Sequence, residues 1–165
     1  MPPPVSFTCT HTTPMAPADI AASILDPDQW TTFKGWGPLP GIAHAEFTRY
    51  NDPPPGSTVS VKATDNSTHT ETITAWDLPH ALAIRMDAFS PPLSRLATHI
   101  DESWTFKPAP QTNTHSDRQS QTHIHRRFDI HPTSAPARWF IAIVIRPMLR
   151  AAIKRHMREL DAPAN

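Results

Sequence analysis

The C-terminal stretch Thr133–Leu160 constrains the fold of this chain more than any other part of the sequence. Thr133 and Ser134 are polar residues of the kind that cap helices, and Pro136 stands where a first helical turn tolerates proline. The run Trp139–Ile145 that follows is apolar nearly all round. A helix of this kind is not stable alone in water, so we expect it to lie on a large apolar surface supplied by the rest of the chain.

Beyond Pro147 the same stretch becomes amphipathic. At about 100° per residue, one arc of the helix carries apolar side chains and the remainder carries basic ones. The apolar arc consists of Ile145, Met148, Leu149, Ala152, Ile153 and Leu160, and the basic residues are Arg146, Arg150, Lys154, Arg155 and Arg158. A proline within the helix also predicts a kink near Pro147.

The rest of the chain is predicted to form mainly short strands. Val5, Phe7 and Cys9 alternate with polar residues, which indicates a half-buried strand. Two short helices are expected next, at 18–25 and around Trp30 and Phe33. Six further strands are predicted at 42–50, 59–63, 69–76, 82–87, 98–107 and 121–130, with a polar loop at 108–119; the inward face of 69–76 is left unassigned. Because most connections are short, the strands should form an antiparallel meander and the chain an α+β fold.

The length and composition fit one domain, which we expect to span residues 1–165 with a core from about 4 to 161. Cys9 is the only cysteine, which excludes an intrachain disulfide and favours a reducing compartment. The N-terminal residues lack the basic and apolar regions of a signal peptide, and the longest apolar run is far shorter than the roughly 20 residues of a membrane span. We therefore expect a cytoplasmic protein without a membrane-spanning segment.

Charge is unevenly distributed although the formal net charge is zero. From Arg118 onward nine Lys/Arg stand against three Asp/Glu, and before it six stand against twelve. This asymmetry is compatible with a basic face that binds nucleic acid or anionic lipid. A solvated helix face explains it more simply, because the basic residues lie mainly on one helix. We expect no nucleic-acid partner.

Several local patterns resemble those of the SRPBCC superfamily, which includes START-domain, pollen-allergen-like and polyketide cyclase/dehydrase proteins. Ala16–Ile20 is similar to the start of the family's first helix, and Leu25–Trp30 to the stop that follows it. Trp76–Arg85 and Thr133–Leu160 stand where the family has a sheet hairpin and its long helix. The resemblance implies a helix-grip fold, in which a curved seven-stranded antiparallel sheet wraps around the C-terminal helix and two short helices follow the first strand. It also implies an apolar cavity between sheet and helix, in which members bind or transform lipophilic molecules.

Ten histidines make apparent metal motifs frequent. His99 and Asp101, with the later His156, imitate the two-histidine, one-carboxylate site that binds iron. On their strand, however, His99 and Asp101 alternate with Ile100 and Trp104, so we expect them to face the solvent. No phosphate-binding loop, dinucleotide-binding glycine motif or nucleophile elbow is present in the sequence. We therefore predict neither a metal site nor a cofactor.

Glu102 and Arg126 are charged residues on apolar strand faces, where each shares its face with aromatic side chains. A hairpin register that pairs Phe106 with Thr122 would bring Glu102 opposite Arg126. A lone buried charge is costly, so we predict an inward ion pair. Two interpretations stay open: a structural ion pair, and an anchor for the polar end of a ligand in the cavity.

His156 falls at the centre of the apolar arc of the C-terminal helix. It is either a core histidine bonded to a nearby carbonyl or a polar group of the cavity that exchanges protons. The predicted ligand-contacting residues share apolar strand or helix faces, with three polar members: Phe33, Phe47, Met86, Glu102, Trp104, Arg126, Phe128, Phe140 and His156.

These features favour binding or carriage of a lipophilic small molecule in the cavity. The alternative is an enzyme of the polyketide cyclase/dehydrase type. In that case the cavity would orient a reactive chain while Glu102, Arg126 or His156 moved protons. The oligomeric state is left open.

Overall fold

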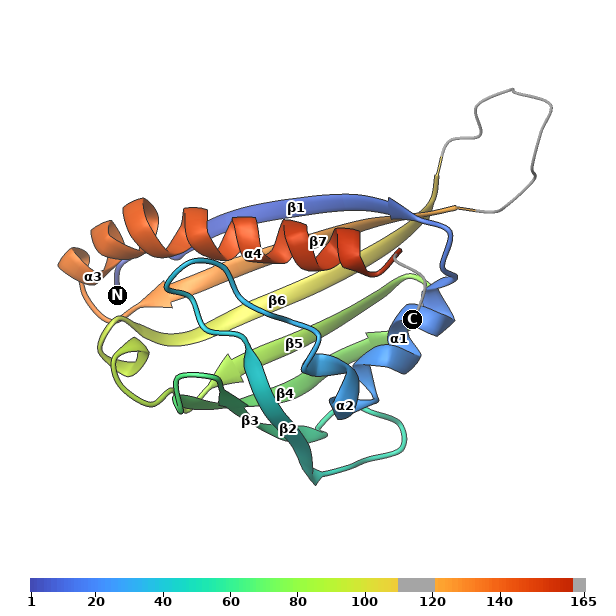
Figure 1. Ribbon diagram of the computed structural model, residues 1–165, viewed down its shortest axis with the longest axis horizontal. Helices are drawn as coiled ribbons and strands as arrows, with labels where there is room; N and C mark the ends of the chain where they lie inside the picture. Colours follow the sequence, from blue (N-terminus) through green and yellow to red (C-terminus); the bar gives the residue numbers. More distant parts are fainter. Residues whose placement is uncertain (110–120, 162–165) are drawn as a thin grey trace.

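A computed structural model describes residues 1–109 and 121–161 of the chain. It contains a seven-stranded antiparallel sheet with the strand order β1-β7-β6-β5-β4-β3-β2 (Figure 1). The strands are β1 (Val5–Thr13), β2 (Ile42–Arg49), β3 (Thr58–Ala63), β4 (Thr68–Asp77), β5 (Ala81–Asp87), β6 (Ala97–Pro108) and β7 (Thr122–Pro132). Strands β2 to β7 form the predicted meander, and β1 pairs with β7 at the edge. The predicted loop at 108–119 lies, apart from its first two residues, outside the described residues.

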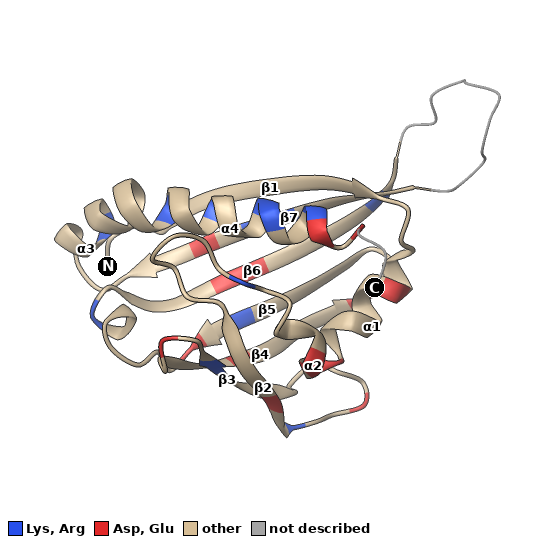
Figure 2. Cartoon of the chain, viewed as in Figure 1, with Lys and Arg blue, Asp and Glu red and all other residues tan. Residues whose placement is uncertain are grey.

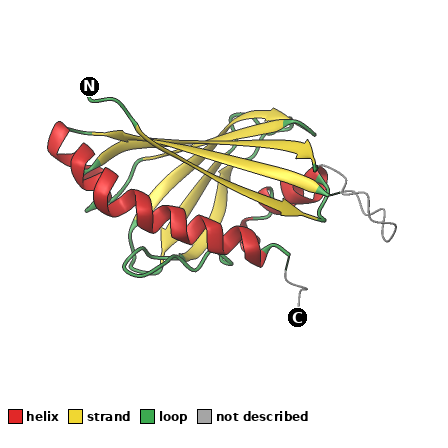
Figure 3. Ribbon diagram, turned by 90° about the horizontal axis from the view of Figure 1, so that it is seen from above, coloured by secondary structure: helices red, strands yellow, loops and turns green. Residues whose placement is uncertain are grey.

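The C-terminal helix lies across the concave face of the sheet, and its last part contacts β1 (Figures 1 and 3). It comprises α3 (Ala135–Phe140), the π-helical segment η2 (Ile141–Ile145) and α4 (Arg146–Glu159). Two short helices, α1 (Pro17–Ile24) and α2 (Pro27–Trp30), follow β1. The α+β helix-grip fold is therefore confirmed. The basic residues of α4 are exposed along the helix, as a solvated face requires (Figure 2).

Local sequence explains where the helix begins and how it accommodates Pro147. Ser134 caps the helix, because its Oγ accepts a hydrogen bond from the Ala137 N–H at 3.2 Å. The helix therefore begins at Ala135 rather than Thr133. Near the predicted kink the helix widens into the π-helical turn that ends at Ile145. Pro147 then lies in the first turn of α4, where a missing N–H removes no hydrogen bond of a regular helical turn.

The two short helices cover one end of the sheet (Figure 1). Asp26 caps α2 by accepting a hydrogen bond from the Asp28 N–H at 3.2 Å. The Trp30 indole N–H donates to the Ile24 carbonyl at 3.1 Å, which ties α2 to the end of α1. Helix α2 also packs against β2. No helix in the described parts of the chain has both the length and the apolar composition needed to cross a bilayer.

One continuous apolar core joins the sheet to α1 and to the C-terminal helix. Alternate strand residues face this core, and Phe7, Cys9, Ile100, Phe106, Ile124 and Ile130 are all buried. Ile153 and Met157 on α4 are buried and Leu149 is partly buried, so the helix rests on the sheet through its apolar arc. The inward face of β4, left unassigned from the sequence, is defined by Glu71 and Ile73.

Candidate ligand-binding site

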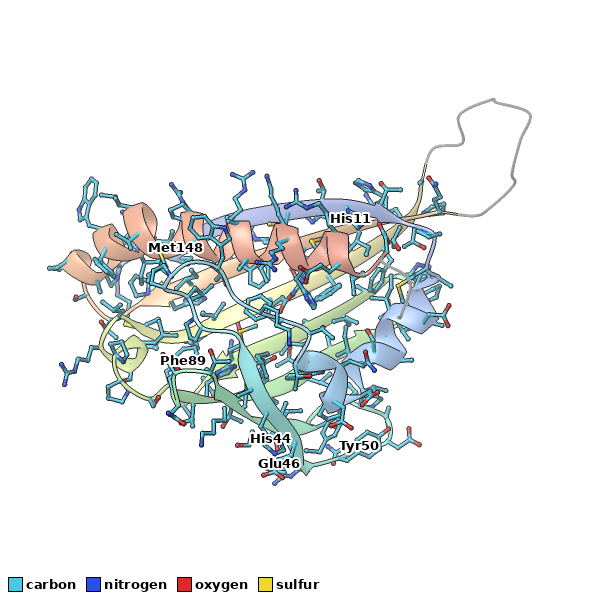
Figure 4. The ribbon with its side chains drawn as sticks, in the orientation of Figure 1. His11, His44, Glu46, Tyr50, Phe89 and Met148 are labelled. Atoms are coloured by element: carbon cyan, nitrogen blue, oxygen red, sulfur yellow. The ribbon has the colours of Figure 1, made fainter. Side chains whose placement is uncertain are left out.

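A cavity of about 400 Å³ lies between the sheet, the short helices and α4. Its wall is mostly apolar and is formed by α1, α2, the loop before β2, strands β4 to β7 and α4. Figure 4 labels Phe89 and Met148, which line the cavity, whereas Glu46 and Tyr50 at the lower end of β2 lie away from it. This volume falls in the range of pockets that bind small molecules, roughly 300–1,000 Å³.

Glu102 on β6 and Arg126 on β7 form a buried ion pair in the cavity wall. The Arg126 Nε–H donates to Glu102 Oε1 at 2.7 Å, and Arg126 Nη2 lies 2.5 Å from the same oxygen. Glu102 is 3% exposed and Arg126 is 6% exposed. Either charge alone would be costly to bury, so each stabilises the other in this position.

The register of the β6–β7 hairpin differs by two residues from the predicted one, which was wrong. Phe106 pairs with Ile124, and Trp104 rather than Glu102 lies opposite Arg126. A shift of two residues keeps every side chain on its own face of the sheet, so Glu102 and Arg126 still meet, but diagonally. The connection sets the register of a hairpin, and the sequence between these strands contains no Asn-Gly or Asp-Gly turn that would have defined it.

Aromatic rings hold the Arg126 guanidinium against the wall. Its Cζ lies 3.9 Å from the centroid of the Trp104 ring and 5.3 Å from that of Phe128. Phe7 stacks on Phe128 in turn, with ring centroids 4.8 Å apart. Stacking on aromatic faces stabilises the cation and defines the plane of its N–H groups. The orientation of Arg126 is thus determined by the core behind it.

Three buried polar atoms of the cavity wall have no hydrogen-bond partner among the described residues: Trp104 Nε1, Arg126 Nη1 and His156 Nδ1. The indole and guanidinium nitrogens can only donate, whereas the histidine nitrogen donates or accepts according to its tautomer. Buried polar groups are normally hydrogen-bonded. These atoms therefore mark the part of the wall that is suited to hold polar atoms of a ligand.

The Glu71 and Glu102 carboxyl groups interact electrostatically in the cavity wall. Burial raises the pKa of the Glu102 carboxyl above its usual value, and the positive charge of Arg126 opposes that shift. The nearby Glu71 carboxylate raises the pKa of Glu102 further. The Trp104 indole lowers it least, although its N–H meets no acceptor with hydrogen-bond geometry in the described chain. An additional carboxylate in this wall is therefore unfavourable mainly because burial penalises its charge, and Glu71 adds a smaller repulsion.

His156 on α4 faces the cavity across from the ion pair. Burial, followed by the charge of Arg126, lowers the pKa of His156 to about 4, and Glu159 acts in the opposite direction. Its ring makes an edge contact with Phe33, with centroids 5.6 Å apart. At neutral pH the side chain is therefore uncharged and can accept a proton or a hydrogen bond.

Glu71 is a cavity residue that the sequence analysis did not identify. It is 7% exposed, and its Oε1 lies 3.0 Å from His69 Nε2. Glu71 lies two residues from Ile73 and therefore on the same face of β4, which could have identified it. However, a register shift between Ile73 and Ala75 interrupts the alternation of β4. A bulge of this kind cannot be read from a two-residue period.

Seven of the nine predicted contact residues line the cavity: Phe33, Met86, Glu102, Trp104, Arg126, Phe128 and His156. Phe47 does not, because it packs in a separate small cluster on β2 and β3 and makes an edge contact with Tyr50. Phe140 does not either: it is 45% exposed and lines a separate outer groove. At about 100° per residue, Phe140 lies on the opposite side of the helix from Leu149, so helical phase alone places it away from the apolar arc of α4. Whether the seven contact a ligand stays a prediction.

The apparent iron motif does not come together, because His99 and Asp101 lie on the outer face of the sheet and His156 lies in the cavity. Instead, His131 Nε2 lies 3.2 Å from Asp101 Oδ2, and the His131 and His99 rings stack with centroids 3.9 Å apart. The Arg85 Nε–H also donates to Asp101 at 2.8 Å. This guanidinium already neutralises the carboxylate and repels a second cation.

The sequence profile described as "Polyketide cyclase / dehydrase and lipid transport" matches residues 4–164. The chain belongs to this family. The match covers nearly the whole chain, so it agrees with the fold and with the SRPBCC resemblance described above. No curated protein sequence matches the chain.

Solved structures with the same fold come from plants and bacteria. Norcoclaurine synthase from Thalictrum flavum is 13% identical with a TM-score of 0.62, and the match covers 100% of this chain and 99% of that one. Major latex-like protein 151 from Panax ginseng is 12% identical with a TM-score of 0.62, covering 98% and 100%. A START superfamily protein from Mycobacterium smegmatis is 12% identical with a TM-score of 0.60, covering 94% and 98%. At these identities the likeness concerns the fold alone.

Proposed function

We propose that this protein binds a lipophilic small molecule in the cavity between the sheet and α4, as a carrier or binding protein. The observation that carries the proposal is a mostly apolar cavity of about 400 Å³ with one polar cluster, Glu102, Arg126 and Trp104, in its wall. An apolar wall binds the body of a ligand, and a few placed polar groups orient it. Lipid transport in the family description supports this reading.

Nile red, a neutral apolar dye that fluoresces when it leaves water, tests the proposal directly. Leu149→Trp should fill the cavity from α4 and weaken dye binding by about tenfold or more. Ile143→Trp is the matched control, because Ile143 is 66% exposed on the same helix and should leave binding unchanged. Circular dichroism of both variants checks that the fold is retained. Equal dye binding by the wild type and Leu149→Trp would contradict the proposal.

A second candidate function is catalysis of the polyketide cyclase/dehydrase type. The observation that favours it is His156, a cavity-lining residue that is neutral at neutral pH and whose buried Nδ1 has no hydrogen-bond partner among the described residues. His156 can take up a proton while the Arg126 guanidinium stabilises negative charge that develops on a carbonyl oxygen. In that case His156→Gln should lower kcat far more than it changes KM for a linear polyketide thioester. Unchanged kcat would argue for the binding function alone.

We further propose a cytoplasmic location and a small lipophilic partner rather than nucleic acid. Cell fractionation with an antibody against the chain tests the location. Gel-shift titration with DNA and RNA tests the second point, and saturable binding of either would contradict it.

A further inference from the structure

The charges of the cavity wall restrict which ligands it can accept, if the proposed binding function holds. Arg126 is the only Lys or Arg among the described lining residues, whereas Glu71 and Glu102 contribute buried carboxyl groups and Asp65 contributes an exposed one. The positive charge of Arg126 is already paired with Glu102. A ligand carboxylate placed here would lose its hydration in a buried site whose only arginine is already paired, and it would lie near the Glu71 carboxylate, which is unfavourable.

The same wall offers two hydrogen-bond donors that find no acceptor among the described residues. Arg126 Nη1 and Trp104 Nε1 are buried and unpartnered among the described residues, and the guanidinium lies over the indole ring at 3.9 Å. Both N–H groups therefore lie on one stretch of wall. A carbonyl or hydroxyl oxygen has two lone pairs and can accept from both, whereas a hydrocarbon would leave both unpaired.

We infer that the cavity selects neutral lipophilic molecules with a hydrogen-bond-accepting oxygen, such as ketones and alcohols, and discriminates against carboxylates such as fatty acids. Arg126 and Trp104 bind the oxygen, the apolar wall binds the hydrocarbon, and Glu71 with Glu102 repels an acid. His156, neutral and facing the same space, hydrogen-bonds a second oxygen or hydroxyl where the ligand has one. This inference rests on the proposed binding function and adds the chemical class of the ligand.

Competition against bound Nile red with four compounds of equal chain length tests the inference: methyl nonyl ketone, undecanol, undecanoate and undecane. At neutral pH the ketone and the alcohol should displace the dye at concentrations about tenfold or more below that of undecanoate. They should also act at lower concentrations than undecane, because only they accept from Arg126 and Trp104. Equal or stronger displacement by undecanoate would overturn the inference.

Two conservative variants locate the selectivity in named groups. Trp104→Phe keeps an aromatic ring and removes one N–H, so it should weaken the binding of the ketone relative to that of undecane by roughly threefold to tenfold. Glu71→Gln keeps the shape and removes a negative charge, so it should strengthen the binding of undecanoate relative to that of the ketone. If both variants keep the ligand preferences and the melting temperature of the wild type, the assignment of the selectivity to Trp104 and Glu71 is wrong.

The inference and the proposed function fail in different ways. Dye binding that Leu149→Trp abolishes, combined with no preference for the neutral oxygen compounds, would leave the binding function intact and overturn the ligand class. Absence of any dye binding, with no thermal shift by any of the four compounds, would overturn both.

A different observation concerns the outside of the molecule, where the C-terminal helix begins. Trp139 and Ile143 are each 66% exposed and Phe140 is 45% exposed. Large apolar side chains that gather on a surface mark interaction sites. Phe140 also lines an outer groove that shares Pro38, Pro92, Leu96, Ile145 and Met148 with the ligand cavity. The exposed apolar surface therefore lies at the rim of the cavity.

The charges around this surface identify its partner. Between Asp129 and Glu159 the sequence contains no Asp or Glu but six Lys/Arg. Arg146 and Arg150 are exposed on the turns that follow the apolar residues, and basic residues run along the helix (Figure 2). Exposed Trp, Phe and Ile beside arginines are the combination that inserts into the interface of an anionic bilayer.

We propose that the Trp139–Ile143 surface docks on anionic lipid membranes and places the cavity rim against the lipid. Nucleic acid fits this surface less well, because Ile143 and Trp139 offer apolar bulk at a helix end rather than a basic groove with stacked aromatic rings. Docking of this kind is reversible and depends on both the apolar side chains and the arginines.

Co-sedimentation with phosphatidylcholine vesicles, with and without phosphatidylserine, tests the membrane proposal. The protein should bind only vesicles that contain phosphatidylserine, and high salt should release it. Trp139→Ser/Ile143→Ser should lower binding about tenfold or more, and Arg146→Gln/Arg150→Gln by a similar factor. Tyr50→Ser is the matched control, because Tyr50 is 56% exposed on the other side of the molecule and should bind like the wild type. Wild-type binding by the Trp139/Ile143 variant, or tighter binding to single-stranded RNA than to the vesicles, would overturn the proposal.

Discussion

A small number of buried side chains determines the chemistry of the cavity. Arg126 lies between the Glu102 carboxylate and the Trp104 ring, and almost no part of it reaches solvent. The pair is therefore a strong determinant of stability as well as a candidate anchor. Replacing a buried pair by apolar groups is often neutral, whereas removing one partner leaves an uncompensated charge.

Arg126→Met should lower the free energy of unfolding by about 3–5 kcal/mol, because it leaves Glu102 buried without its partner. The double variant Arg126→Met/Glu102→Met should recover most of that loss. Urea unfolding at neutral pH, with tryptophan fluorescence as the signal, measures both. A double variant no more stable than Arg126→Met would show that the loss does not come from the unpartnered Glu102 charge, and it would contradict this account.

The lowered pKa of His156 predicts a loss of stability in mild acid. The ordinary histidine pKa is 6.5 and burial lowers it to about 4, so between these values the unfolded chain binds a proton that the folded chain does not. Stability should therefore fall as pH drops from about 6.5 to about 4, by up to about 3 kcal/mol from this group. Arg126 strengthens the effect and Glu159 weakens it.

His156→Gln removes the titrating ring, and the comparison with wild type separates its contribution from the other histidines. The difference in unfolding free energy between wild type and variant should shrink by about 3 kcal/mol as pH falls through this range, if the wild type is the more stable at neutral pH. Parallel pH profiles for the two proteins would mean that His156 is solvated and not buried.

At the scale of elements, one part of the C-terminal helix packs on the sheet and another part exposes apolar side chains. Its α4 part presents Ile153 and Met157 to the core, while its α3 and η2 part exposes Trp139 and Ile143. The π-helical turn lies between the two parts and changes the phase of the helix by one residue. The same helix can therefore rest on the sheet and still carry an exposed apolar surface.

Truncations on the two sides of the helix should differ sharply. Met157→Ala should cost about 2–5 kcal/mol, because Met157 is 1% exposed and the truncation leaves a cavity in the core. Ile143→Ala should change stability by less than about 0.5 kcal/mol, as is usual at exposed positions. Thermal and urea unfolding of the two variants measure the contrast, and similar costs would mean that the helix is packed differently.

At the scale of the whole molecule, the sheet and helix form one structure rather than two. Each strand pairs with its neighbours across the full order β1-β7-β6-β5-β4-β3-β2, and a single core cluster includes β1, β5, β6, β7, α1 and α4. The first strand, β1, pairs with β7, which joins the N-terminal strand to the last strand of the meander. That arrangement is expected to unfold as one unit.

The single-domain expectation is tested by comparing two probes of unfolding. Tryptophan fluorescence reports the surroundings of the five tryptophans, among them buried Trp104, and far-UV circular dichroism reports helix and sheet together. Their urea transitions should coincide in midpoint and in steepness. Separate transitions would mean that the C-terminal helix leaves the sheet before the sheet unfolds.

The sequence alone was sufficient to predict the helices and strands, the fold, and which face of most strands is buried. Helical and strand periods are local properties, so Thr133–Leu160 predicted the long helix to within two residues at its start. The two-residue alternation of strands also placed Glu102 and Arg126 on the same face as Trp104. The predicted register was wrong by two residues, and an even shift does not change the face of a side chain.

Only the tertiary structure decided the details that local periods do not carry. The pairing of β6 with β7 set their register, so Glu102 meets Arg126 diagonally, and the register shift in β4 between Ile73 and Ala75 interrupted the alternation that would have marked Glu71 as inward. The pairing of β6 with β7 brought His131, not His156, beside Asp101. Each of these outcomes depends on a shift of one or two residues in the backbone, and such shifts are selected by the packing of distant segments rather than by the residues on either side.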